Sequence, residues 1–322
     1  MTRTRIAAAA VVATAACALA APAAAQGDPA AEALRAAGEA FFKQADTLID
    51  DRNYASTTTA HYKVKTDDPR FDTKQAGALL ESVYTFFDSL FASRMTLRSL
   101  DRPGRLYLFY SNFKYKQLFE GGTAGASPPP GHYRSWVDAI VIHTDTVPAG
   151  DLADILVHEA THHLVRRRII GDDHEPSQWL TEGLADYLGY TLRDKEGSFV
   201  AGKIGPKNVA LLRGIPQRSE GLGGLRLRSL KTAVKREEVP DLAAILDAGP
   251  TEFYGAGRDL HYAGAWILVH MLLHTEPAAF AKYLEQEAAG NGSPEVLHAT
   301  VGLDEAALQR RFLEYVDTLK AR

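Results

Sequence analysis

The feature that most constrains this chain is the segment Leu156–Leu164, which reads LVHEATHHL and contains the HExxH pattern. The pattern consists of His158 and Glu159, two intervening residues and His162. On a helix, at roughly 100° per residue, the two histidines lie about 40° apart, so both imidazoles can reach one metal ion. Glu159 lies on the flank of that face, where it can act on a water at the metal but is badly placed to be a ligand. Because chance produces this pattern in only roughly one chain in a hundred of this length, we expect a metal site.

Whether two histidines form such a site depends on a third ligand, and the sequence offers Glu182 twenty positions after His162. Asp186 follows at i+4 on the same predicted helix, where it can accept the remaining N–H of a ligating imidazole. Two histidines, one carboxylate and a water form the open arrangement of catalytic zinc sites, whereas structural sites close all four positions, usually with cysteine. The other zincin layout requires glycine at position 165 and histidine at 168. This chain has Val165 and Arg168, which excludes that layout.

Taken together, the HEATH segment, the nineteen residues after it and Glu182-x-x-x-Asp186 resemble the gluzincin branch of the zincin metallopeptidases, the thermolysin-like clan. The string Trp179–Tyr187, WLTEGLADY, is most similar to bacterial peptidase-MA-like families. The motifs lie in residues 150–190, and a looser resemblance covers most of the mature chain. The resemblance implies an α+β, zincin-type fold with a small mixed sheet, an HExxH helix, a second helix that carries the glutamate and a helical C-terminal lobe.

The chemistry expected of this site is peptide hydrolysis with one zinc ion per chain, held by His158, His162 and Glu182. Zinc lowers the pKa of a bound water towards ~7 and polarises the scissile carbonyl, while Glu159 takes the water's proton and passes it to the leaving amine. The expected partner is a peptide or protein substrate. Two alternatives remain: a catalytically idle zincin-fold binding protein, and a zinc hydrolase that acts on another amide bond, such as one in cell-wall peptide. No lectin-like or wall-binding module in the sequence supports the second alternative.

The donor to the oxyanion is predicted from the resemblance. In the aminopeptidase branch, a tyrosine near the start of a later helix has this role, and the segment 260–268, LHYAGAWIL, is similar to that setting. Tyr262 is therefore the candidate, with His261 and Tyr254 as rivals and a merely packed ring as the alternative. The Gly-Ala-Met-Glu-Asn signature of the clan's aminopeptidases is absent, which favours an endopeptidase.

The remaining histidines give no second site. His163 lies about 140° from His158 on the helix and cannot share its metal, so packing or solvent exposure is expected. Four others have no spacing that demands a function and are interpreted as surface or core residues: His143, His174, His270 and His274.

Apolar periodicity along the rest of the chain is typical of an α+β protein. It predicts helices over 29–50, 73–92, 261–274 and 304–319, and strands over 58–66, 105–110 and 136–143. The HExxH helix is expected to begin after Asp151 as an acidic cap and to end near Arg166–Arg168, with the arginines solvated at the helix end. The resemblance makes 136–143 the edge strand that pairs with extended substrate.

Three further segments are interpreted as surface features. The Gly-, Ser- and Pro-rich segment 121–131 is a mobile connection or, alternatively, a flap over the cleft. The glycines of 221–224 predict flexibility. A weak basic cluster is expected on a solvated helix face: Arg226, Arg228, Lys231 and Lys235.

The first 25 residues predict an export signal. Two arginines precede the Ala-rich apolar run 6–20, and Ala23–Ala25 offers an A-x-A cleavage site. The run is too short and too Ala-rich to favour a membrane anchor. Cys17, the only cysteine, lies within it, but Thr14 disfavours a lipoprotein signal. The mature protein is therefore expected in the periplasm or outside the cell, without disulfides or thiolate catalysis.

Cleavage would leave residues 26–322 and would take the formal charge from −4 to −6, which argues against nucleic acid as a partner. We expect one catalytic unit made of an α/β N-terminal lobe (26–148), the zinc-binding helices (149–195) and a helical C-terminal lobe (203–322). The sequence carries no signal for the oligomeric state.

Overall fold

The computed structural model describes residues 29–49, 54–119, 130–215, 221–239 and 241–320, and 56% of the structure is helical. Its sheets are a five-stranded mixed sheet and a small hairpin, so the α+β class is confirmed. The predicted export signal and the segment 121–129 lie outside the described residues. None of the helices described here is long and apolar enough to cross a membrane.

The five-stranded sheet has the order β1-β2-β3-β5-β4. Strands β2 (Tyr62–Thr66), β3 (Gly104–Phe109) and β5 (Ala139–His143) are parallel, and β1 (Ala55–Thr58) and β4 (Gly131–Arg134) add antiparallel edges. All five residues of β5 are buried, because elements cover both faces of the sheet there. The predicted strand 58–66 is instead the hairpin β1–β2.

The prediction that 136–143 forms the edge strand is wrong. Residues 135–138 form a turn, with Asp138 at φ 56°, and β5 lies between β3 and β4. The edge is β4, which begins at Gly131, where only a loop was expected. The sequence did not indicate the β4–β5 hairpin, because β4 has only four residues and lacks an alternation of apolar and polar side chains.

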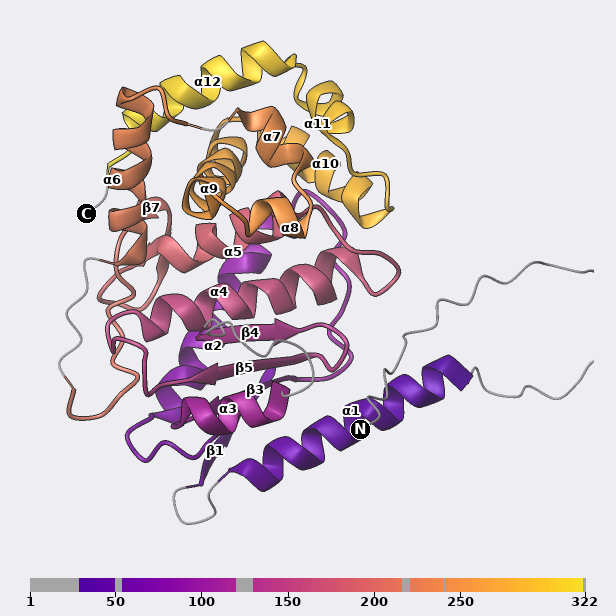
Figure 1. Cartoon of the computed structure of the whole chain (residues 1–322), viewed down its shortest axis with the longest axis vertical. Helices are drawn as coiled ribbons and strands as arrows, with labels where there is room; N and C mark the ends of the chain where they lie inside the picture. Colours follow the sequence, from indigo (N-terminus) through magenta and orange to yellow (C-terminus); the bar gives the residue numbers. More distant parts are fainter. Residues whose placement is uncertain (1–28, 50–53, 120–129, 216–220, 240, 321–322) are drawn as a thin grey trace, which may run out of the picture.

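Helices cover the two faces of the sheet separately (Figure 1). One face carries α2 (Thr73–Phe91) and the HExxH helix α4 (Leu152–Leu164), and the opposite face carries α1 (Pro29–Leu48) and α3 (Asn112–Phe119). In the second layer Phe42 of α1 stacks on Tyr107 of β3, with ring centroids 6.2 Å apart. Helix α4 packs against β5 and β4 and therefore lies beside the edge strand of the sheet.

The C-terminal lobe packs on α4 through α5 (Gln178–Tyr190), which lies between α4 and the buried helix α9 (Arg258–Thr275) (Figure 1). A Cβ atom at Gly183 would lie 2.6 Å from the Ala265 carbonyl oxygen, so glycine is required for this close helix approach. Five further helices pack against α9: α6 (Leu222–Lys235), α7 (Leu242–Asp247), α8 (Pro250–Phe253), α10 (Pro277–Ala288) and α12 (Glu305–Thr318). Helix α11 (Pro294–Val301) packs against α7 and α10. A hairpin of β6 (Thr191–Arg193) and β7 (Phe199–Ile204) connects α5 to the segment before α6.

Two local predictions are corrected here. Gly223 and Gly224 are buried inside α6, so 221–224 begins a helix instead of a flexible segment. Asp151 occupies the N-cap position of α4, but its side chain makes no capping hydrogen bond.

The arginines after α4 are not solvated, because they lie in a π-helical turn, Val165–Ile170, that packs against acidic residues. Arg168 is buried and donates to Asp88 at 2.7 Å, and Arg167 pairs with Asp101. These ion pairs attach the end of α4 to the N-terminal lobe.

Candidate metal centre

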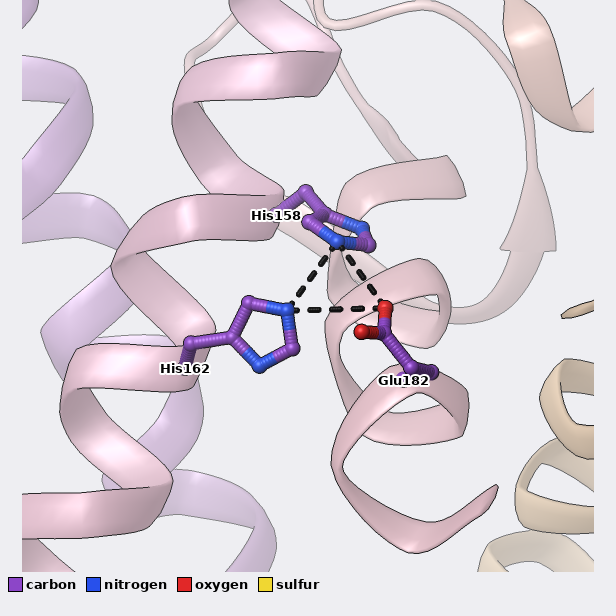
Figure 2. Close-up of side chains that lie close together, drawn as sticks. All are labelled: His158, His162 and Glu182. Atoms are coloured by element: carbon purple, nitrogen blue, oxygen red, sulfur yellow. Dashed lines mark hydrogen bonds and ion pairs between the residues drawn. The ribbon is translucent and has the colours of Figure 1, made fainter. Parts of the chain in front are cut away.

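Helices α4 and α5 bring the three predicted ligands together (Figure 2). The Nε2 atoms of His158 and His162 lie 3.1 Å apart. Oε2 of Glu182 lies 3.3 Å from Nε2 of His158 and 3.5 Å from Nε2 of His162. No other group of three such side chains converges in this way within the described ranges.

The donor atoms fit a zinc ion. A tetrahedron with bonds of about 2.0–2.1 Å has edges of about 3.3–3.4 Å, which matches the three separations. Oε2 of Glu182 is buried and meets no hydrogen-bond donor among the residues that the structure describes. A buried carboxylate oxygen is costly without a partner, and a metal ion would supply one.

Asp186 holds the first histidine from behind. Its Oδ1 lies 2.9 Å from Nδ1 of His158, an arrangement that directs Nε2 towards the other two ligands. Burial disfavours the charged imidazole, but the hydrogen bond with Asp186 and the negative charges of Asp186 and Glu182 raise the pKa of His158 well above its usual range. Burial likewise opposes the charged form of Glu182, yet the two histidines hold the pKa of its carboxyl well below the ordinary value.

Arg226 lines the cleft, so the prediction that it lies on a solvated helix face is wrong. Its Nη1 donates to Oδ2 of Asp186, and its guanidinium lies 4.8 Å from the ring centre of Tyr262. Burial opposes its charge, but Asp186 raises the pKa of Arg226 above its ordinary value. No local signal distinguished it from the other basic residues of α6, because its partner lies 40 residues away.

Glu159 is buried beside the ligands and is anchored by the edge strand. Its Oε2 accepts a hydrogen bond of 2.7 Å from the backbone N–H of Tyr133 in β4. Gly131 leaves room for this side chain, since a Cβ atom there would lie 3.2 Å from Cγ of Glu159. Burial raises the pKa of the Glu159 carboxyl, with the two histidine charges acting in the opposite direction. A raised pKa suits a group that must both take and return a proton.

Of the three candidates for the oxyanion donor, two reach the cleft. Tyr262 and Tyr254 both line it, with ring centroids 6.1 Å apart. The Tyr254 hydroxyl donates to Oε1 of Glu182 at 2.6 Å. His261 is not among the cleft-lining residues, and its Nδ1 lies 3.0 Å from the Phe253 carbonyl oxygen.

The cleft that contains these residues has a volume of about 1270 Å³ and is bounded by β4, α4, α5 and the C-terminal lobe. His132 of β4 also lines it and was missed in the sequence. Its Nδ1 lies 2.5 Å from the Tyr115 hydroxyl, and burial together with nearby Arg134 and His162 lowers its pKa to about 4. Its isolated position in the sequence carried no spacing that could have indicated it.

The other histidines lie outside the centre. His163 is buried against Tyr62, and burial lowers its pKa to about 4. His143 is buried beside Asp145, and His174 lies 2.5 Å from the Glu287 carbonyl oxygen. His270 is buried in the C-terminal lobe, whereas His274 is exposed, with its Nε2 2.9 Å from the Tyr187 hydroxyl. Comparison with protein-family models and with curated protein sequences found no match to this chain.

Proposed function

We propose that this protein is a zinc-dependent metallopeptidase of the gluzincin type, and an endopeptidase rather than an aminopeptidase. The observation that carries the proposal is the convergence of His158, His162 and Glu182 at tetrahedral spacing beside the buried carboxyl of Glu159. This set of donors leaves a fourth position for water or substrate, as in catalytic zinc sites. The HExxH and WLTEGLADY segments, which resemble the peptidase-MA-like families, support the same assignment.

When bound, zinc supplies the Lewis acidity that polarises a peptide carbonyl and makes water nucleophilic near neutral pH. Glu159 takes the proton of the attacking water and delivers it to the leaving nitrogen. The Tyr133 N–H holds Oε2 of Glu159, which leaves Oε1 as the proton acceptor. The Tyr262 hydroxyl is proposed to donate a hydrogen bond to the oxyanion from the opposite wall of the cleft.

The open edge of β4 is proposed to hold the substrate backbone. His143 of β5 donates to the Pro130 carbonyl, and ladder bonds in an antiparallel pair alternate, so the peptide groups of Gly131 and Tyr133 face away from β5. The hydrogen bond from Tyr133 to Glu159 agrees with this direction. An extended peptide could pair with this edge as an added strand, which would place its carbonyl groups beside the metal centre. The size of the cleft suits several residues of a polypeptide.

The Ala-rich segment before Gln26 supports export to the periplasm or the outside of the cell as part of this proposal.

Digestion of a peptide library by the purified mature protein tests the function. We expect cleavage at internal bonds, loss of cleavage with a chelator and recovery with zinc. Stoichiometric zinc without cleavage of any peptide would favour the idle binding protein instead. Cleavage of cell-wall peptide alone would favour the hydrolase of another amide bond.

A further inference from the structure

The two carboxylate oxygens of Glu182 have different surroundings, although they belong to one ligand. Oε2 faces the imidazoles of His158 and His162 and meets no hydrogen-bond donor among the described residues. Oε1 accepts a hydrogen bond of 2.6 Å from the Tyr254 hydroxyl and one of 3.3 Å from the Gln178 side-chain amide. Oε2 can therefore bind a metal ion, whereas Oε1 already accepts two hydrogen bonds.

Tyr254 and Gln178 reach this oxygen from different elements. Gln178 is the first residue of α5, one turn before Glu182, and its Nε2 also donates to the Tyr254 hydroxyl at 2.5 Å. Tyr254 follows α8 in the C-terminal lobe, 72 residues after Glu182. The amide thus directs the phenolic proton towards the carboxylate, since Gln178 uses the hydroxyl oxygen as its acceptor. An O–H group bound to a carboxylate forms one of the stronger hydrogen bonds in proteins.

We propose that Tyr254 is a positioning residue that keeps Glu182 a one-oxygen ligand of the metal. This inference rests on the zinc site of the proposed function and deepens it. If Oε1 were released, the carboxylate could rotate and bind through both oxygens, which would fill the position that water or substrate needs. The phenol therefore preserves an open coordination position, as the partners behind metal ligands commonly do.

A tyrosine that only packs would behave differently from a tyrosine that holds a ligand. The ring of Tyr254 contacts Phe253 edge-on, with centroids 5.6 Å apart, and the residue is 44% exposed. Tyr254→Phe keeps that ring contact and removes only the hydroxyl. Because the residue is half-exposed in a loop, the variant should fold as the wild type does.

The test measures zinc affinity by competition with a chromophoric chelator, together with the visible absorption of the cobalt-substituted protein. We expect Tyr254→Phe to bind zinc about 10–100-fold more weakly, the usual loss when a partner of a metal ligand is removed. Its cobalt absorption should lose intensity, because a second carboxylate oxygen raises the coordination number. Tyr110→Phe is the matched control, since Tyr110 is 49% exposed, contacts Arg70 and is not among the residues that line the cleft.

The outcomes separate this inference from the function on which it rests. A wild-type protein that binds no zinc would contradict the proposed function itself. A wild-type protein that binds zinc and cleaves peptides, with Tyr254→Phe equal to it in affinity and cobalt spectrum, would overturn only the role of Tyr254. Gln178→Leu should weaken zinc binding by less, since its amide is 3.3 Å from Oε1. A larger loss in Gln178→Leu than in Tyr254→Phe would make the amide, not the phenol, the group that holds the carboxylate.

Discussion

Two histidine pairs in this protein have the same spacing on a helix and nearly the same distance between their rings. His158 and His162 on α4 have ring centroids 4.8 Å apart, and His270 and His274 on α9 have centroids 4.7 Å apart. Both pairs are i,i+4 neighbours, each on a single helix. We call them the cleft pair and the α9 pair; in the α9 pair His270 is buried and His274 is exposed.

The pairs differ in what faces them. The cleft pair meets the carboxylates of Glu182 and Asp186. The α9 pair meets phenols instead: Nδ1 of His270 lies 2.9 Å from the Tyr315 hydroxyl, and Nε2 of His274 lies 2.9 Å from the Tyr187 hydroxyl. Burial and its neighbour His274 lower the pKa of His270 to about 3, while the acids raise that of His158. Helical spacing therefore brings two imidazoles together, and the charge opposite them decides whether a cation is favoured.

The largest expected effect is on metal content. His162→Ala should abolish stoichiometric zinc binding, because only two of the three protein ligands of a catalytic zinc site would remain. His274→Ala, the matched change in the α9 pair, should still bind one zinc per folded chain. Metal analysis of both variants after dialysis measures this. Full zinc in His162→Ala would remove the distinction between the pairs.

The next effect concerns turnover beside the cleft pair. Glu159→Gln should keep zinc but lower kcat by roughly 10²–10⁴-fold, because an amide cannot accept the water's proton. Glu175→Gln is the control, since Glu175 also lines the cleft but pairs with Arg166. Peptide cleavage and metal content are measured together. Loss of zinc from Glu159→Gln would show that the residue is a ligand.

Tyr262→Phe tests the opposite wall of the cleft. If the hydroxyl stabilises the oxyanion, kcat should fall by about 10²–10³-fold, worth roughly 2.7–4 kcal/mol, with little change in KM or zinc affinity. Steady-state kinetics and chelator competition distinguish it from Tyr254→Phe, whose first effect should be on zinc affinity. Turnover within a few-fold of wild type would show that the Tyr262 ring only packs.

Asp186→Asn removes the negative charge beside His158 but keeps an oxygen that can accept a hydrogen bond from its Nδ1. Zinc affinity or activity should fall by about 10–100-fold, because the imidazole of His158 loses a charged partner and Arg226 loses its ion pair. Zinc competition measures the loss. Equal affinity and turnover in the variant would leave Asp186 with no role at the metal centre.

The smallest effect is the acid sensitivity caused by His270, the buried member of the α9 pair. The folded chain holds His270 neutral down to about pH 3, whereas an unfolded histidine titrates near 6.5. Between these values the unfolded chain binds more protons, so stability falls as the pH falls, by at most about 1.4 kcal/mol per pH unit for this residue. His270→Asn should show a shallower decline in urea unfolding between pH 6.5 and 4.5. An unchanged slope would contradict the assignment.

The sequence by itself predicted the candidate ligands, which the fold brings together, and much of the secondary structure. The periodicity of 73–92 gave α2 within one residue at its end, and the spacing of His158, His162 and Glu182 indicated residues that the fold brings together. These features are local, since one helix face orders the two histidines and another helix carries the glutamate with Asp186. His270 and His274, however, have the same i,i+4 spacing. The sequence did not show which of the two pairs has carboxylates opposite its imidazoles.

Only the tertiary structure decided which groups surround the candidate metal centre. Tyr133 reaches Glu159 across 26 residues, Arg226 reaches Asp186 across 40 and Tyr254 reaches Glu182 across 72. The identity of the edge strand, β4 instead of β5, belongs to the same class of facts. Such contacts depend on how α5 packs between α4 and α9 and on how a short hairpin closes the sheet. No periodicity along the chain encodes those distances, because they arise from the packing of whole elements against one another.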